Sequence, residues 1–397
     1  MHRFSWGTLT VAALISACGG GETPATDSAQ AVRGVSDTEI ILGTHTDLSG
    51  SIAILGVDGA NGARMRFEEA NEAGGIHGRK IRFIVEDSQY QVPRAIQAAN
   101  KLINRDKIFA MVMAIGTPTN NAVLTRQLEA GVPNLFPISG ARSMVEPFHR
   151  LKFHARGIYY EEIRAATKYF VEEKGRERPC VVYQDTDYGQ EIYEGALDQA
   201  AAMGMELAAV SAHRPTENEF TAAILRLRNA GCDLVLMGTV VRDTILVLET
   251  ARKMGWTDVA WVGNNAAYNQ AVADQESGAG EGYYAFVHMA MIYRDNPRSD
   301  EVAAWWDKFV DKYGRNPEYI AFEAYRNADL VVKGLENAGR DLTVDSLIAG
   351  LEAIEDYEDI FGYRLKFGPD DHQGVSESTL SQIKDGRWHT LAESITY

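Results

Sequence analysis

The chain has 397 residues, too many for one ordinary domain, and its content of 45% hydrophobic and 24% charged residues is typical of a globular protein. An excess of acidic over basic residues gives a formal net charge of −16. This charge argues against nucleic acid as a partner and against charge-driven binding to anionic lipid. The nine histidines are scattered and only three cysteines are present, so we expect no metal and no cofactor.

The first eighteen residues have the pattern of an export signal. A weakly basic start precedes the mostly apolar run 4–15, which is too short to span a bilayer, and small residues lead to Cys18. The sequence Ile-Ser-Ala-Cys resembles the lipobox of bacterial lipoproteins, in which the cysteine is lipidated and becomes the mature N-terminus. The alternative is a signal peptide followed by a chance cysteine. We predict a lipoprotein signal peptide over residues 1–17 and an exported protein, lipid-anchored through Cys18 to a membrane, in the periplasm or at the cell surface.

Residues 18–34 contain mainly small and polar side chains, including Gly19-Gly20-Gly21, and show no apolar periodicity. This composition is typical of a flexible linker. We predict that the segment is a tether that holds the folded part of the protein away from the membrane.

From residue 35 on, short apolar runs alternate with segments of helical periodicity. Ala60, Ala63 and Phe67 recur at helical spacing before the stop at Gly74-Gly75, and Pro93 favours a helix start. The expected strands of this first series are 39–43, 80–85, 108–114 and 132–138.

A second series of strands and helices follows. Its expected strands are 180–184, 206–211, 234–237 and 259–262, with helices at 190–202, 218–229 and 242–254. Two such series imply two parallel sheets covered by helices on both faces. The later helices, 300–313, 321–338 and 344–353, come too late for a third domain and are expected to pack on the first. Segments 364–367 and 378–383 look like strands, with a hairpin turn at Asp385-Gly386.

Two such sheets suit the binding of a small molecule. Ligands of open α/β sheets bind beyond the carboxyl ends of the strands. Two of these edges placed face to face form a cleft that closes by hinge bending.

Several loop sequences form a further pattern. They are Leu48-Ser49-Gly50, Gly56, Gly59, Gly62-Ala63, Gly74-Gly75-Ile76, Gly78-Arg79-Lys80-Ile81, Ala114-Ile115-Gly116-Thr117, Pro137-Ile138-Ser139-Gly140-Ala141 and Asp185-Thr186-Asp187-Tyr188-Gly189. Together they resemble the type I solute-binding proteins of ABC importers, with the branched-chain amino-acid (leucine-binding) group as the closest likeness. The resemblance implies an α/β, two-lobed type I periplasmic-binding-protein fold, in which each lobe is a parallel sheet flanked by helices and the ligand lies in the interlobe cleft. With three crossovers, lobe 1 is expected to comprise 35–155 and about 285–355, and lobe 2 to comprise 156–284 and about 356–397 with the C-terminal crossover.

The resemblance also places ligand-binding loops in the first lobe. Its ligand contacts here are Ser49, Gly116, Thr117, Thr119, Gly140, Ala141 and Arg142. Backbone N–H groups and hydroxyls at the start of a helix favour an anion, although Thr117 or Thr119 alone can equally act as a helix cap. Arg142 replaces the threonine usual in the family. Its guanidinium suits a ligand carboxylate, with exposure to solvent or a pair with Glu146 as the alternatives.

The second lobe departs from the amino-acid binders. Its matched ligand contacts are Tyr159, Tyr188, Thr239, Val240 and Asn265. Tyr159 and Asn265 stand where the family carries acidic residues, and Val240 stands where it carries a tyrosine. A buried ligand ammonium needs a paired anion, so we predict a pocket unlike a leucine site. It favours an amide, an uncharged solute or a carboxylate without an α-amine, with an aromatic or extended apolar part.

Cys180 and Cys232 each stand just before or at the start of an expected strand. If these strands are neighbours in a parallel sheet, the two sulfurs meet at its lower edge, and an exported protein allows a disulfide. The alternative is two separate buried thiols that act as small apolar residues.

The resemblance implies a substrate-binding lipoprotein that captures a small solute (amino acid, amide or organic acid) and delivers it to the permease of an ABC importer. We expect a monomer. The alternative is a ligand-sensing domain that reports to a membrane receptor or regulator. The chain has no dinucleotide-binding fingerprint, nucleophile elbow or zinc-protease motif, so we expect no enzyme.

Overall fold

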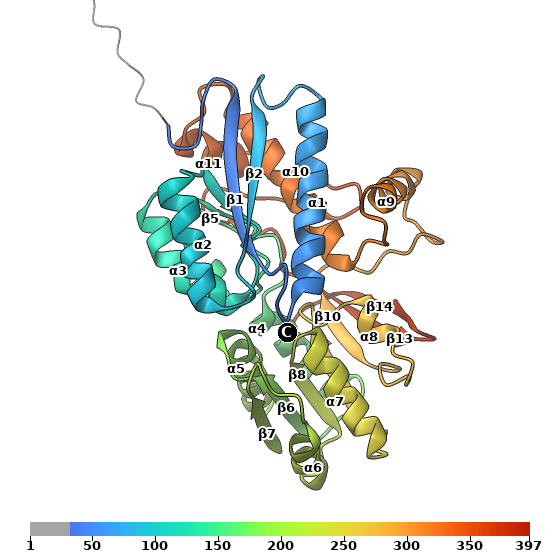
Figure 1. Cartoon of the computed structure of the whole chain (residues 1–397). Helices are drawn as coiled ribbons and strands as arrows, with labels where there is room; N and C mark the ends of the chain where they lie inside the picture. Colours follow the sequence, from blue (N-terminus) through green and yellow to red (C-terminus); the bar gives the residue numbers. More distant parts are fainter. Residues whose placement is uncertain (1–31) are drawn as a thin grey trace, which may run out of the picture. The chain divides into compact units, whose positions relative to one another are not determined.

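The computed structural model describes residues 32–397, which fold around two separate main sheets (Figure 1). The first sheet has five strands in the order β2-β1-β3-β4-β5, and every neighbouring pair is parallel. Its strands are β1 (Glu39–Thr46), β2 (Lys80–Asp87), β3 (Ala110–Val112), β4 (Asn134–Leu135) and β5 (Lys152–Phe153). Since all five run the same way, their carboxyl ends lie along one edge.

Helices cover both faces of the first sheet, as Figure 1 shows. On one side α2 (Val92–Asn100) continues into a short π-helical turn and packs against α3 (Thr117–Glu129). On the other side α1 (Ala53–Glu72) packs along α10 (Tyr319–Ala338). The remaining helices of this lobe are α9 (Asp300–Tyr313), against α1, and α11 (Val344–Glu352), against α10. The late helices therefore belong to the first lobe in space.

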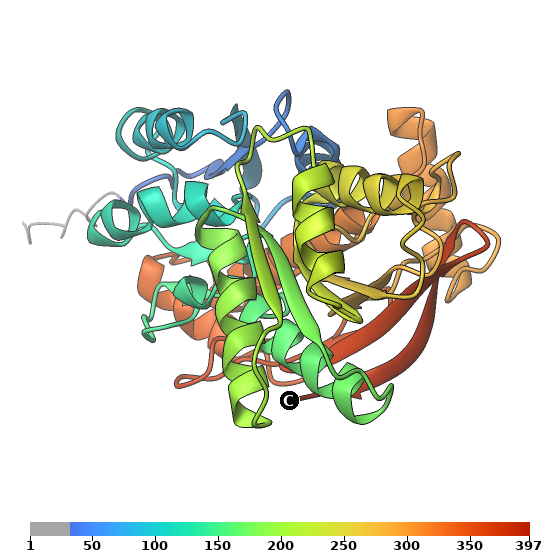
Figure 2. The same cartoon turned by 90° about the horizontal axis from the view of Figure 1, so that it is seen from below.

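The second sheet has seven strands in the order β14-β13-β10-β9-β8-β6-β7. The parallel strands are β6 (Pro179–Gln184), β7 (Ala209–His213), β8 (Leu234–Gly238), β9 (Ala260–Asn264) and β10 (Tyr284–Val287). The antiparallel hairpin of β13 (Ser378–Lys384) and β14 (Arg387–Ile395) extends this sheet beyond β10 and forms its curved red edge in Figure 2. The second sheet is therefore mixed at one edge.

The helices of the second lobe pack around this sheet. They are α4 (Tyr159–Glu172), α5 (Asp187–Ala202), α6 (Thr221–Asn229), α7 (Val241–Lys253) and the short α8 (Gln270–Ala273). Helices α4 and α5 pack together and against the strands, whereas α6 and α7 contact each other on the other side (Figure 2). A two-stranded sheet of β11 (Tyr357–Glu358) and β12 (Arg364–Leu365) completes the fold.

The chain passes between the lobes three times. It leaves the first sheet after β5, returns after β10 to build α9, α10 and α11, and leaves again before β13. Three connections side by side form a hinge that permits opening and limits twisting.

The expected elements agree with the observed ones except at a few places. The strand expected at 206–211 lies instead at Ala209–His213, because β7 takes its register from β6, where Cys180 pairs with Ala209. The strands expected at 108–114 and 132–138 are shorter than the apolar runs that contain them. Strand β5 and helix α4 were not expected, and both contribute to the site described below.

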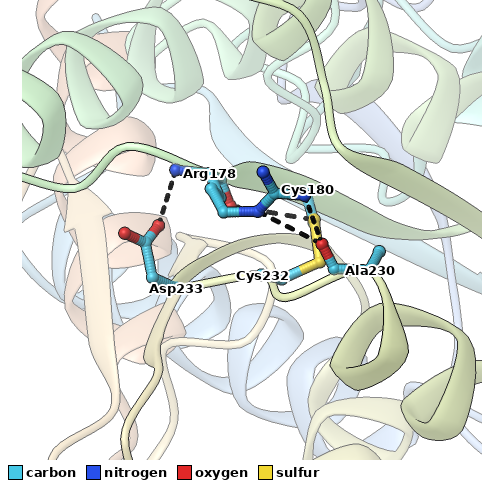
Figure 3. Close-up of a disulfide and its surroundings, with 5 residues drawn as sticks. All are labelled: Arg178, Cys180, Ala230, Cys232 and Asp233. Carbon is cyan, nitrogen blue, oxygen red and sulfur yellow. Dashed lines mark hydrogen bonds between the residues drawn. A yellow bond between two sulfur atoms is a disulfide. The ribbon is translucent and has the colours of Figure 1, made fainter.

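Cys180 and Cys232 form a disulfide in the structure (Figure 3), with a Cα–Cα distance of 5.9 Å. Cys180 lies in β6 and Cys232 lies just before β8, and these two strands are neighbours. The surrounding loop is held by Asp233, whose carboxylate accepts a hydrogen bond of 2.8 Å from the backbone N–H of Arg178, and by the Arg178 side chain, which donates to the carbonyl of Ala230. The disulfide thus closes the amino-terminal edge of the second sheet.

The predicted signal peptide, Cys18 and nearly all of the predicted tether lie outside the described residues. Among the helices of residues 32–397, none combines the length and apolar character needed to cross a membrane.

Candidate functional site

A small cavity lies where the carboxyl ends of the two sheets meet. Its volume is about 30 Å³, on a measure by which one water needs about 10–15 Å³. The segments after all five strands of the first sheet contribute to it, and so do those after β6, β8 and β9 of the second. The lining residues are Ile52, Leu55, Tyr90, Ile115, Gly116, Thr117, Ile138, Arg156, Tyr159, Tyr188, Val240 and Ala266.

Three tyrosines form the aromatic part of the cavity wall. The rings of Tyr159 and Tyr188 meet edge to face, with centroids 5.0 Å apart. The Tyr188 hydroxyl donates to the carbonyl oxygen of Thr239 over 3.2 Å, which fixes the ring at the start of α5. Burial raises the pKa of Tyr90, Tyr159 and Tyr188, so all three are neutral. They present apolar ring surface to a solute.

Arg156 is the one charged residue in the cavity lining. Its Nη1 pairs with the carboxylate of Glu323 on α10, and its Nε donates to Oδ1 of Asn265 over 2.9 Å, with Nη2 bonded to the same oxygen. Burial acts to lower the pKa of Arg156, but the charge of Glu323 and its hydrogen bond, together with Tyr159 and Tyr319, more than offset this effect and the pKa rises. A guanidinium has five N–H donors, so one N–H on each of Nη1 and Nη2 remains for a ligand.

Glu162 completes the polar network next to the cavity. The Nδ2 group of Asn265 donates to both of its carboxyl oxygens, over 2.9 and 2.8 Å. Burial raises the pKa of Glu162 to about 8, against the opposing effects of Asn265 and Arg156. At neutral pH Glu162 is therefore mainly protonated, and the charge of Glu323 is already paired with Arg156. No free carboxylate charge in this network is available to a ligand ammonium.

The loop before α3 brings backbone close to the ligand cavity. Gly116 has φ of 94°, and a side chain there would collide with the ring of Tyr90, so only glycine suits this position. Thr117 lines the cavity, and its hydroxyl lies 2.8 Å from that of Ser139. Thr119 instead donates back to the carbonyl oxygens of Ile115 and Gly116, and so acts within the loop.

The predicted ligand residues divide into two groups in the structure. Gly116, Thr117, Tyr159, Tyr188 and Val240 line the cavity, whereas Ser49, Thr119, Gly140, Ala141, Arg142, Thr239 and Asn265 do not. Asn265 lies one hydrogen bond away, behind Arg156.

The residues outside the lining have other partners. Ser49 is exposed and donates to Asp87 over 2.6 Å. The carbonyl of Gly140 accepts from the backbone N–H of Tyr159 over 2.7 Å, and a side chain at Gly140 would meet the Tyr159 ring. Ala141 is fully buried, and the hydroxyl of Thr239 pairs with that of Thr244. The carbonyl groups of Gly140 and Thr239 thus hold two of the three cavity tyrosines, Tyr159 and Tyr188, in place.

Arg142 points neither into the cavity nor toward Glu146. It donates from Nε to Glu191 over 2.9 Å, and from Nη2 to Glu194, both on α5 of the second lobe. Its guanidinium also lies over the Tyr160 ring, 4.1 Å from the centroid. Because Arg142 follows β4 of the first sheet, these contacts join the two lobes beside the cleft.

Sequence reasoning missed Tyr90, Arg156, Glu162 and Glu323. Tyr90 and Arg156 follow β2 and β5, at the carboxyl ends where ligands of α/β sheets bind. Strand β5 has only two residues, so no strand signal directed attention to Arg156. Glu323 comes from α10, far away in the sequence. Within residues 32–397 no group of three acidic, histidine or cysteine side chains is arranged to hold a metal ion.

The fold and the position of the cavity identify the class of protein. The family model described as "Periplasmic binding protein" matches residues 39–387, and the chain belongs to this family. Its solved neighbours are two-lobed type I binding proteins, among them a leucine-binding protein from Thermotoga maritima with a TM-score of 0.77, at 16% identity over 90% of this chain and 99% of that one.

Relatives of known name differ in what they bind. The chain is 23% identical over 372 residues to a "Leu/Ile/Val-binding protein homolog 8" of Brucella abortus, which covers 89% of this chain and 90% of the relative. It is similar in structure to a fatty acid ABC transporter substrate-binding protein from Thermomonospora curvata, with a TM-score of 0.82 and 21% identity over 94% and 95% of the two chains. A solute-binding protein from R. palustris in complex with benzoate gives a TM-score of 0.79 at 19% identity, over 90% and 97% of the chains.

Proposed function

We propose that this periplasmic binding protein captures a small organic acid with an apolar or aromatic body and delivers it to the permease of an ABC importer. In this proposal Cys18 carries the lipid anchor. Solute enters the cleft while the lobes are apart and gains contacts from both lobes as they close.

The observation that carries the choice of ligand is the position of Arg156. Its guanidinium is the single charged group among apolar and aromatic lining residues, and it retains two N–H donors after its protein contacts are counted. Two N–H donors on one guanidinium suit a carboxylate. The tyrosine rings and the aliphatic side chains suit the rest of the solute.

An amino acid fits this cavity less well. Its ammonium needs an anion, and the two carboxyl groups nearby are engaged by Arg156 and Asn265. Relatives that bind benzoate or fatty acids show that the family fold accommodates acids without an amine. They support an organic acid as the solute of this chain.

The cavity volume of about 30 Å³ leaves no room for such a solute in the observed closed arrangement. We therefore expect the bound form to hold the lobes slightly further apart, with the tyrosine rings displaced. The small-angle scattering curve of the protein without solute should fit a mixture of open and closed forms. After solute is added, the curve should fit a single form.

A calorimetric comparison of matched compounds tests the proposal. Benzoate is compared with benzamide, and leucine with its keto acid, 4-methyl-2-oxopentanoate. We expect each acid without an amine to bind at least tenfold more tightly than its partner compound. If leucine binds more tightly than its keto acid, or benzamide more tightly than benzoate, the assignment of Arg156 to a carboxylate fails.

A further inference from the structure

A second and larger cavity lies at the hinge. Its volume is about 410 Å³, and residues of the second and third interlobe connections line it together with Arg326 of α10. The lining residues are His288, Arg298, Arg326, Gly362, Tyr363, Arg364, Leu365, Gly374, Val375, Ser376, Glu377, Thr379, Glu393 and Ser394. None of these residues lines the cleft cavity, so the two spaces are separate.

Arg326 supplies a buried cation to this hinge cavity. The residue is 1% exposed and forms no ion pair among the described residues, although its charge acts to lower the pKa of the buried carboxyls of Glu323 and Asp359. Its Nη2 donates to the carbonyl oxygen of Ala155, on the first connection, and Nε and Nη2 both contact the side-chain oxygen of Asn327. Nη1 has no hydrogen-bond partner among residues 32–397. A buried guanidinium with an unused donor and no paired anion favours an anionic ligand.

Arg298 adds a second cation held by neutral groups. Its Nη1 donates to the carbonyl oxygen of Phe361 over 2.9 Å, and its Nη2 to the hydroxyl of Tyr363 over 2.7 Å. These contacts orient the guanidinium without neutralising its charge. The hydroxyls of Ser376, Thr379 and Ser394 also line the cavity, and none has a hydrogen bond to the described part of the chain.

The acidic residues that line the cavity lie at its rim. Glu377 and Glu393 are both exposed, so water screens them more than it screens Arg326. Arg364 is exposed as well and pairs with Glu358 over 2.7 Å. The charged lining residues are three arginines and two glutamates, in a chain whose net charge is −16. Among the charged lining residues only Arg326 is buried, so the positive charge lies inside the cavity and the glutamates lie at its exposed rim.

We propose that the hinge cavity binds a small anion that carries a carboxylate or phosphate group, with its oxygens on Arg326 and Arg298 and on the free hydroxyls. The site is distinct from the cleft and does not depend on the solute that the cleft takes. Such an anion would lie against the second and third connections and would reach the first only through Arg326, which donates to the carbonyl oxygen of Ala155.

Calorimetric titration of the mature protein tests this proposal, with inorganic phosphate and succinate as probes and sodium chloride at matched ionic strength as the blank. We expect saturable binding of at least one probe. Phosphate alone would assign the site to phosphate groups, and succinate alone to carboxylates. Absence of saturable binding for both probes would overturn the proposal.

Variants locate the anion within the molecule. Arg298→Gln should lower the affinity at least tenfold, and Arg298→Lys should restore part of it. Glu377→Gln should raise the affinity about two- to fivefold, because it removes a repelling charge at the rim.

Arg294→Gln is the control, since Arg294 pairs with Asp307 and does not line the cavity. If Arg298→Gln and Glu377→Gln bind the probe as the unmodified protein does, the anion lies elsewhere and the assignment is wrong. Because these substitutions lie on the exposed or partly exposed side of the cavity, the test does not require the buried Arg326 to be replaced.

Discussion

Arg156 and Glu323 form an ion pair in which both side chains are almost wholly removed from solvent, with 3% and 0% of their surfaces exposed. The pair joins the first interlobe connection to helix α10 and places the guanidinium at the wall of the ligand cavity. A buried pair of this kind gives little net stability, but removal of one partner leaves an uncompensated charge and costs about 3–5 kcal/mol. Tests of ligand recognition must therefore keep the charges balanced.

The first prediction concerns Arg156 as the carboxylate contact. Arg156→Lys keeps the charge but loses the planar fork, and we expect the affinity for benzoate to fall by about 2–3 kcal/mol, the range for a lost charge-assisted hydrogen bond. The double variant Arg156→Gln with Glu323→Gln removes both charges and should fold without binding benzoate. Calorimetry measures the affinity of each variant for benzoate, and urea unfolding measures its stability. Benzoate binding by the double variant with unchanged affinity would exclude Arg156 from recognition.

The second prediction concerns the buried carboxyl of Glu162, whose pKa burial raises from 4.5 to about 8. The folded protein keeps a proton that the unfolded chain releases. The stabilising effect of that proton is complete below pH 4.5 and is lost as the pH rises through 8, at about 1.4 kcal/mol per pH unit between these values. Glu162→Gln stays neutral, so the free energy of unfolding of the variant should exceed that of the unmodified protein by a growing margin from pH 6 to pH 8.

Urea unfolding at several pH values measures this difference. Glu172→Gln, on the exposed end of the same helix, is the control and should show no such trend. Benzoate affinity should also fall as Glu162 ionises near pH 8, because the new negative charge lies close to Arg156. A pH-independent difference between Glu162→Gln and the unmodified protein would show that Glu162 is ionised throughout this range.

The third prediction concerns Arg142, which contacts Glu191 and Glu194 across the cleft. These ion pairs exist only while the lobes are together, and partly exposed pairs contribute about 0.2–1 kcal/mol each. Arg142→Gln should therefore accelerate solute release and weaken benzoate binding about two- to fivefold, much less than Arg156→Lys. Small-angle scattering should show a larger radius of gyration for the unliganded variant. A loss of affinity as great as that of Arg156→Lys would instead indicate direct contact with the ligand.

Some of the site could be predicted from the sequence because local patterns carry it. Thr117 and Tyr188 both begin helices directly after strands or turns of recognisable composition, and both line the cavity. That the ligand loops lie at the carboxyl ends of the strands follows from the parallel arrangement of the sheets alone. The placement of these residues needed no information about distant segments.

The polar network could not be predicted in the same way. Arg156, Asn265 and Glu323 come together from three separate parts of the chain, and only the folded hinge brings them into contact. Arg142 shows the converse case. Its position in a ligand loop suggested a carboxylate of the solute, but two carboxylates of α5 lie nearer and satisfy the guanidinium.

The fourth prediction concerns the disulfide between Cys180 and Cys232, which are 52 residues apart in the sequence. Closure of a loop of this length lowers the entropy of the unfolded chain and contributes about 4 kcal/mol to stability. Replacement of both cysteines by alanine should lower the free energy of unfolding by about this amount. Benzoate affinity should not change, because the disulfide lies at the amino-terminal edge of the sheet and the cleft lies at the other. Urea unfolding with and without reductant checks this, and a protein indifferent to reductant would contradict the bond.

The last prediction concerns the membrane anchor. If Cys18 carries the lipid, Cys18→Ser blocks lipidation and the protein should leave the membrane fraction, either as a soluble form or as an uncleaved precursor. Stable anchoring to a membrane takes at least two acyl chains or equivalent signals. The variant has no lipid at residue 18, so the change in fractionation should be nearly complete. Benzoate affinity should be unaffected, because residues 32–397 contain the whole cleft.

Ala17→Gly, which keeps a small residue before the cysteine, is the matched control and should remain with membranes. A cleaved Cys18→Ser protein that still fractionates with membranes would mean that the chain is held there by something other than a lipid on this cysteine.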